Sequence, residues 1–176
     1  VARYHPIKDH KNLLNALSIV RSKNKHFCCI LVGFDMNRNN KILFNEIKRL
    51  QLDKCVKLLG PKNNISQVMN GLDINILCSK SEGFPSVIVE AMACGTPCIA
   101  TDVGDSALII GKTGWIVPPE DSIKLAKAIE RALSEIGKNN WKKRCDQARL
   151  RIKNNFGINK MIKSYNVIWS NIYNRN

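Results

Sequence analysis

The sequence lacks any apolar run that could cross a bilayer, and no secretory signal is visible at its start. A membrane-spanning helix needs about 18 or more consecutive apolar residues, whereas the longest apolar stretch here, residues 27–34, has the length of a strand. The chain of 176 residues is about one domain long and opens on Val1 rather than on Met. We therefore expect a cytoplasmic location, and we expect the chain to be cut from a longer protein.

The sequence also lacks C-x-x-C pairs, although it contains seven cysteines. The adjacent Cys28 and Cys29 would point to opposite faces of a strand, which suits neither a disulfide framework nor a zinc site. Cys94 and Cys98 flank a Gly-Thr-Pro turn, where metal ligation is a weaker explanation than packing. We expect buried thiols in a reducing compartment and no metal.

Acidic and aromatic residues are scarce: 14 Asp and Glu face 28 Lys and Arg, and aromatics make up 6% of the chain. A nucleic-acid-binding domain would gather its basic residues on one face, with aromatics or a recognised motif, whereas here they are scattered. We therefore expect no nucleic-acid partner.

Lys and Arg residues are denser in the last third of the chain: Lys138, Lys142, Lys143, Arg144, Arg149, Arg151 and Lys153. On exposed helices such a cluster attracts anionic lipid headgroups by about 1 kcal/mol per charge, so an anionic membrane surface stays open as a partner beside a merely solvated face.

Strand-length apolar segments alternate with amphipathic helical ones until Asp121, after which the pattern is wholly helical. We expect strands at 1–3, 26–32, 56–59, 74–78, 97–101 and 115–117. We expect the later helices at 65–72, 86–93, 105–110, 121–136, 139–154 and 158–173. This alternation predicts an α/β fold with a doubly wound, parallel, Rossmann-like sheet and a C-terminal helical tail.

Glu82 and Glu90 lie on either side of a predicted helix start. The turn 83–85 follows Glu82, and the helix 86–93 would direct its free N–H groups and positive dipole end at an anion such as a phosphate. Glu90 has apolar sequence neighbours, so we expect it to need a partner. A phosphate at the helix start, flanked by two carboxylates that bind hydroxyls, indicates a nucleotide-sugar site. The alternative is a dipole partner at Glu82 and a solvated Glu90.

Five segments together resemble the C-terminal domain of the retaining glycosyltransferases of family 4, also called group 1, which have the GT-B architecture. The segments are Glu82–Pro97, which looks like the E-x7-E block of the family, and 1–8, 31–33, 58–60 and 101–104. The resemblance covers essentially the whole chain. It implies that residues 1–176 form a nucleotide-sugar-binding domain and that the acceptor-binding N-terminal domain is absent.

The resemblance also implies roles for single residues. Arg3 and Lys8 would hold the donor diphosphate, and Glu82 would accept hydrogen bonds from the donor sugar; these three are the implied catalytic residues. Glu90 would bind the ribose hydroxyls, and Leu59 with Gly60 would border the base. The residues of the turn and of the helix start would contact phosphate and sugar: Gly83, Phe84, Pro85, Ser86 and Val87. Pro85 has no N–H to donate.

The reaction implied is transfer of a sugar, with retained anomeric configuration, from a nucleotide donor such as a UDP- or GDP-sugar to a glycan or lipid-linked acceptor. No cofactor is implied, and the sequence has no Asp-x-Asp motif for a metal. Polysaccharide biosynthesis is the expected setting, and we expect this domain alone to transfer little. Leu108 stands where the family often has Glu. The alternatives are half of a nucleotide-sugar 2-epimerase and a non-catalytic nucleotide- or membrane-binding module.

Overall fold

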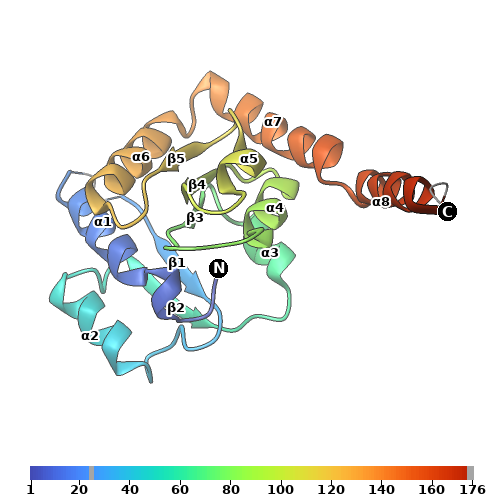
Figure 1. Ribbon diagram of the computed structural model, residues 1–176. Helices are drawn as coiled ribbons and strands as arrows, with labels where there is room; N and C mark the ends of the chain where they lie inside the picture. The colour runs from blue at the N-terminus through green and yellow to red at the C-terminus, as the bar shows by residue number, and fades with distance from the viewer. Residues whose placement is uncertain (24–25, 174–176) are drawn as a thin grey trace.

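The computed structural model describes residues 1–23 and 26–173, which form an α/β fold with parallel strands (Figure 1). The strands form two hydrogen-bonded groups. In one, β1 (Cys29–Val32) pairs with β2 (Val56–Gly60). In the other, the order is β3 (Asn75–Leu77), β4 (Cys98–Thr101) and β5 (Trp115–Val117). Every pair is parallel, as the alternation of strands and helices predicts.

The N-terminal residues run alongside β1 without being assigned as a strand. The Ala2 N–H donates to the Val32 carbonyl, and the Tyr4 N–H donates to the Phe34 carbonyl, both at 2.9 Å. The strand predicted at 1–3 is therefore present only as these two backbone hydrogen bonds. The strand predicted at 26–32 begins at Cys29 instead, because its partner β2 begins opposite Cys29 at Val56.

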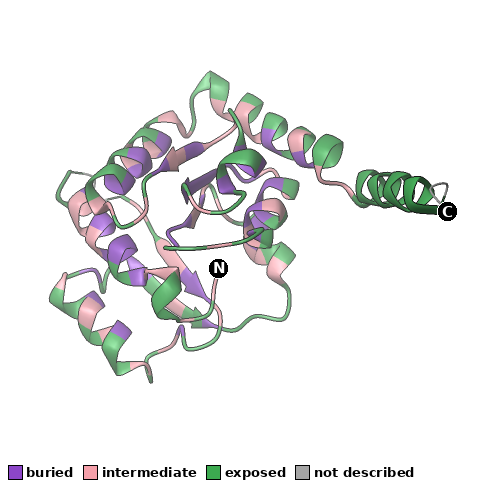
Figure 2. Cartoon of the chain, in the orientation of Figure 1, coloured by how far each residue is buried: buried purple, intermediate pink, exposed green. Residues whose placement is uncertain are grey.

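Helices cover both faces of the strands, which confirms the doubly wound arrangement. Side chains alternate along β4: Ile99 packs in one apolar cluster, whereas Cys98 and Ala100 pack in the other. The first cluster includes residues of α1 (His10–Lys23), α2 (Lys41–Arg49) and α6 (Ser122–Glu135). The second includes residues of α3 (Ile65–Asn70), α4 (Ser86–Ala93), α5 (Ser106–Ile110) and α7 (Asn139–Asn155). Buried residues accordingly lie on the inner sides of these helices (Figure 2).

The predicted helical tail is confirmed, and its last helix leaves the body of the domain. α8 (Ile158–Tyr173) projects away from the strands and has no buried residue (Figures 1 and 2). Large apolar side chains are exposed along it, among them Met161, Tyr165 and Trp169. Among the described residues, no helix is both long enough and apolar enough to span a bilayer.

Two arginines of the basic last third serve the fold. Arg151 donates to the carbonyls of Leu108 and Ile109 at 2.6 and 2.7 Å, and so binds the free carbonyls at the end of α5. Arg144 binds one carboxylate oxygen of Glu135 at 2.7 Å and lies over the Trp115 ring, 4.5 Å from its centroid. These contacts fix α7 to the domain and remove both cations from any free basic surface.

His10 begins α1 as a buried, neutral side chain. Its ring stacks on Tyr4 with 5.5 Å between centroids, and its Nδ1 atom has no hydrogen-bond partner. Burial lowers the pKa of His10 to about 4, and the positive charge of Lys8 acts in the same direction.

The free energy of unfolding should therefore fall as the solution is acidified. The pKa of His10 is below its unfolded value of about 6.5, so its contribution is complete above pH 6.5 and is lost as the pH falls toward about 4. Between pH 7 and pH 5 the loss should be about 2 kcal/mol in urea titrations. His10→Phe keeps an aromatic ring against Tyr4 and should remove most of this dependence; an unchanged pH slope in that variant would show that other groups cause it.

Candidate functional site

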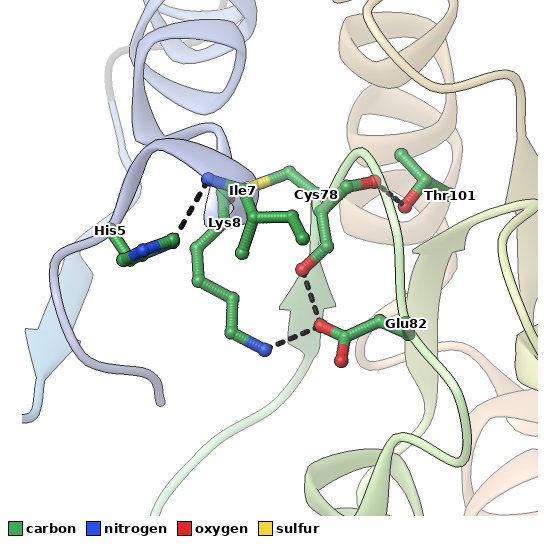
Figure 3. A network of polar contacts seen from close by, with 7 residues as sticks. His5, Ile7, Lys8, Cys78, Glu82 and Thr101 are labelled. Carbon is green, nitrogen blue, oxygen red and sulfur yellow. Dashed lines mark hydrogen bonds and ion pairs between the residues drawn. The ribbon is translucent and has the colours of Figure 1, made fainter.

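The loop after β3 and the short 3-10 helix at Pro6–Lys8 meet beyond the ends of the strands (Figure 3). The Lys80 N–H donates to the Ile7 carbonyl at 2.8 Å. The Cys78 thiol donates to the Lys8 carbonyl, with 3.1 Å between sulfur and oxygen. Burial raises the pKa of Cys78 to about 12, so the thiol keeps the proton that it donates. These contacts fix the backbone that carries Lys8 against the loop that carries Glu82.

Lys8 and Glu82 form an ion pair at the centre of this junction. The Lys8 Nζ atom lies 2.6 Å from Glu82 Oε1, and the two side chains are only 23% and 13% exposed. The Ser79 hydroxyl donates to the same oxygen, also at 2.6 Å. The structure therefore brings together two of the three predicted catalytic residues and adds a third side chain, Ser79.

A neighbouring loop supports the turn after Glu82. The Asp105 N–H donates to the Gly83 carbonyl at 2.9 Å. Gly104 has φ +51° and packs so closely that an added Cβ would lie 2.4 Å from the Glu82 carbonyl oxygen and 2.2 Å from that of Gly83. Only glycine fits both this backbone conformation and this distance.

The start of α4 is open to a ligand. Pro85 occupies the N-cap position, and no side chain caps the helix. The free N–H groups of Ser86 and Val87 therefore remain available, together with the positive end of the helix dipole. Phe84 is 53% exposed, and its ring lies near that of Phe156, with 6.1 Å between centroids. The predicted helix 86–93 has the predicted bounds.

Glu90 is exposed, so its apolar neighbours in the sequence do not bury it, and its need for a partner stays a prediction. Successive helical residues point in directions about 100° apart, and in α4 Ile88, Ala91 and Met92 face the core while Ser86 and Glu90 face outward. Among the described residues, Glu90 makes no hydrogen bond and no ion pair. Its carboxylate lies one helical turn beyond Ser86, on the side that a ligand at the helix start could reach.

The other predicted residues are separate from the Lys8–Glu82 pair. Arg3 is exposed and has no hydrogen bond or ion pair among the described residues. Leu59 and Gly60 lie at the end of β2, where Leu59 is 38% exposed and the Gly60 N–H donates to the Met36 carbonyl at 2.8 Å. No hydrogen bond in the described chain links them to the turn after Glu82.

The sequence places Ser79 and Thr101 at strand ends but assigns no role to either residue. The Thr101 hydroxyl donates to the Ser79 carbonyl at 2.7 Å, and both residues are completely buried. The available signal was position, because both residues lie at the carboxyl ends of β3 and β4, the edge where ligands bind in parallel sheets.

The thiols are less uniformly buried than the sequence predicts. All seven cysteines are free, and Cys55, Cys78 and Cys98 are buried, whereas Cys28 is exposed. Cys28 precedes the first paired residue of β1, so no neighbouring strand covers it. In the part of the chain that the structure describes, no three His, Cys, Asp or Glu side chains form a group that could hold a metal ion.

Comparisons with known proteins agree on one family. A family model described as glycosyl transferases group 1 matches residues 1–135. A curated relative, the N-acetyl-alpha-D-glucosaminyl L-malate synthase of Bacillus anthracis, is 32% identical over 129 residues, which are 72% of this chain and 33% of that protein.

Solved structures of similar proteins have the same fold. A glycosyltransferase from Rickettsia africae has a TM-score of 0.89 at 28% identity, over 99% of this chain and 47% of that one. HepE of Anabaena, solved in complex with UDP, has a TM-score of 0.85 at 27% identity, over 97% of this chain and 47% of that one. HepE was also solved in complex with UDP-glucose. The chain thus spans about half the length of these structures and a third of the curated relative.

Gly104→Ala should displace the loop that carries Glu82. A methyl group at 2.2–2.4 Å from two carbonyl oxygens forces the loops apart, in a backbone conformation that alanine adopts poorly. We expect the free energy of unfolding to fall by about 2 kcal/mol in urea titrations. Gly83→Ala is the matched control, because a Cβ at Gly83 meets no atom within 4 Å. Equal stability losses in the two variants would contradict this account of the loop contact.

Proposed function

We propose that this chain, which belongs to the glycosyl transferases of group 1, binds the nucleotide-diphosphate sugar that serves as donor in glycosyl transfer. The observation that carries the proposal is the Lys8–Glu82 pair beside the uncapped start of α4. A cation, a carboxylate and a free helix N-terminus provide partners for a diphosphate and for the hydroxyls of a sugar.

The residues divide between the charged and the hydroxyl-bearing parts of the donor. Lys8, the exposed Arg3 and the N–H groups at the start of α4 are suited to the diphosphate, because a guanidinium and an ammonium both donate to phosphate oxygens. Glu82 accepts hydrogen bonds from the sugar. Glu90, exposed and without a hydrogen bond or ion pair in the described chain, accepts from the ribose hydroxyls. Leu59 and Gly60 border the base.

Rate enhancement in this site would come mainly from stabilising the leaving group. When the bond between the sugar and the diphosphate breaks, negative charge collects on the diphosphate. Preorganised cations and N–H groups stabilise that charge without reorganising. Arg3 and Lys8 supply the positive charge for this stabilisation without a metal. The family resemblance supports retention of the anomeric configuration, which NMR of the glycoside product would test.

The whole enzyme would transfer the donor sugar to an acceptor. The acceptor is a glycan or a lipid-linked sugar that binds a further domain, so this chain alone transfers little sugar; the length of the relatives supports this. The reaction takes place in the cytoplasm.

UDP is the first nucleotide to test, because HepE was solved with UDP and with UDP-glucose. The similarity to transferases favours this function over an epimerase or a non-catalytic module.

Calorimetry on this chain should separate the phosphate and ribose contacts. Arg3→Ala should weaken UDP and inorganic diphosphate alike, by roughly tenfold, because it removes a charged hydrogen-bond donor. Glu90→Ala should weaken UDP by a similar factor and leave inorganic diphosphate unchanged. Asp53→Ala, which removes an exposed carboxylate outside the site, is the control.

Two results would contradict the proposal. If UDP, GDP and ADP all fail to bind at millimolar concentration, the donor-binding function is wrong. If Glu90→Ala weakens UDP and inorganic diphosphate by the same factor, Glu90 does not bind the ribose.

An anionic membrane surface is a second candidate partner, favoured by the exposed face of α8. Lys160 and Lys163 lie on this helix beside its exposed apolar side chains, Lys153 lies just before it, and no Asp or Glu follows Asp146 in the sequence. Helices that combine basic and apolar side chains in this way lie in the headgroup region of a bilayer. We propose that α8 brings the domain to the inner face of the membrane, where a lipid-linked acceptor would lie.

Vesicle sedimentation tests this second role. Phosphatidylglycerol vesicles should bind the chain more strongly than phosphatidylcholine vesicles, and the double variant Lys160→Glu, Lys163→Glu should reduce that binding by roughly tenfold or more. The double variant Lys54→Glu, Lys57→Glu makes the same change in net charge at exposed positions outside α8. Equal losses in both double variants would show that only total charge matters, and absence of binding by the unchanged chain would exclude the membrane role.

A further inference from the structure

Ser79 is held at both ends in the completely buried position where β3 meets the Glu82 loop. Its hydroxyl donates to Glu82 Oε1 at 2.6 Å, and its carbonyl accepts from the Thr101 hydroxyl at 2.7 Å. Thr101, the last residue of β4, is also completely buried. The contacts of Thr101 and Glu82 belong to the network drawn in Figure 3. The backbone that carries the hydroxyl is therefore fixed to β4 by Thr101, and the hydroxyl is directed at Glu82.

Both donors to Glu82 use the same carboxylate oxygen. Lys8 Nζ and the Ser79 hydroxyl each lie 2.6 Å from Oε1. Within the described residues, Oε2 makes no hydrogen bond. Because the carboxylate is planar, fixing one oxygen on its inner side turns the other outward, where it can accept a hydrogen bond from a ligand.

The two donors differ in what a nucleotide diphosphate would do to them. Lys8 has a flexible side chain that is 23% exposed, and its ammonium group would be drawn to the diphosphate. Ser79 is completely buried, so its hydroxyl does not reach the ligand. Once Lys8 shares its protons with the phosphates, Ser79 is the donor that still fixes the carboxylate.

We propose that Ser79 is a positioning residue that holds Glu82 with Oε2 directed at the donor sugar, and that Thr101 fixes Ser79 for this purpose. The inference rests on the proposed donor-binding function, and it concerns the sugar part of the donor only. Ser79 acts through Glu82 and touches neither the nucleotide nor the sugar.

Ser79→Ala should therefore weaken the sugar contact selectively. We expect the variant to bind UDP as the unchanged chain does, and to bind the preferred UDP-sugar about tenfold more weakly, since it lacks one hydrogen bond to a charged group. A residue with a merely structural role would weaken both ligands together. Calorimetry with UDP, UDP-glucose and UDP-N-acetylglucosamine measures the two affinities separately.

Ser106→Ala is the matched control, because Ser106 is equally buried and its hydroxyl has no hydrogen-bond partner. This variant should change neither affinity. Thr101→Val keeps the shape of the side chain and removes the hydroxyl that fixes Ser79, so it should show a smaller, sugar-selective loss. In a Glu82→Ala background, Ser79→Ala should have no further effect on the UDP-sugar.

The outcomes separate this inference from the donor-binding function. If the unchanged chain binds no nucleoside diphosphate, the donor-binding function fails, and this inference fails with it. If UDP binds but no UDP-sugar binds with a different affinity, Glu82 does not contact the sugar; this inference and the sugar role of Glu82 are then wrong, whereas nucleoside diphosphate binding stands. Equal losses of UDP and UDP-sugar in Ser79→Ala overturn it as well. Should Ser79→Ala fail to fold, Ser79→Cys replaces it, and its weak S–H donor should give the same selective loss.

Discussion

The ion pair between Lys8 and Glu82 is the interaction on which the site depends. It joins residues 74 positions apart in the sequence, and both side chains are largely removed from water. Removing two charges from water is costly, and a pair that has only its own attraction does not always recover that cost. Here Ser79 adds a second donor to the carboxylate, which lowers the cost of burying it. The pair thus depends on three residues from two chain segments rather than on two residues alone.

The sheet explains why these segments meet. Parallel strands direct all their carboxyl ends to one edge, so the loops after β3 and β4 lie side by side there. The close approach of Gly104 to the backbone of residues 82 and 83 fixes the distance between those loops. On the other side, the backbone hydrogen bond from Lys80 to Ile7 aligns the N-terminal segment. The side chains of the site therefore rest on backbone contacts.

Local signals in the sequence predicted most of the fold. A proline before an apolar octet gave the bounds of α4, and turn residues on both sides gave those of β5. Signals that depend on partners failed: the strand at 1–3 is not assigned, and the strand at 26–32 begins at Cys29, where its partner begins. Within the site, composition around Glu90 was misleading because sequence neighbours on a helix face different ways. The family resemblance implied that Lys8 and Glu82 share one site, but their direct ion pair could not be predicted, since no local pattern encodes a contact between distant loops. The hydrogen bond from Ser79 to Glu82, three residues away, depends on side-chain conformations that the sequence does not specify.

The isolation of α8 has an energetic consequence. None of its residues is buried, so the strands and the other helices contribute almost nothing to its folding. A helix of 16 residues without packing is close to the length at which helices in water are marginal. We therefore expect α8 to open and close as a cooperative unit of its own, with amide hydrogens that exchange far faster than those of β4. Whatever surface covers this helix supplies the free energy that orders it.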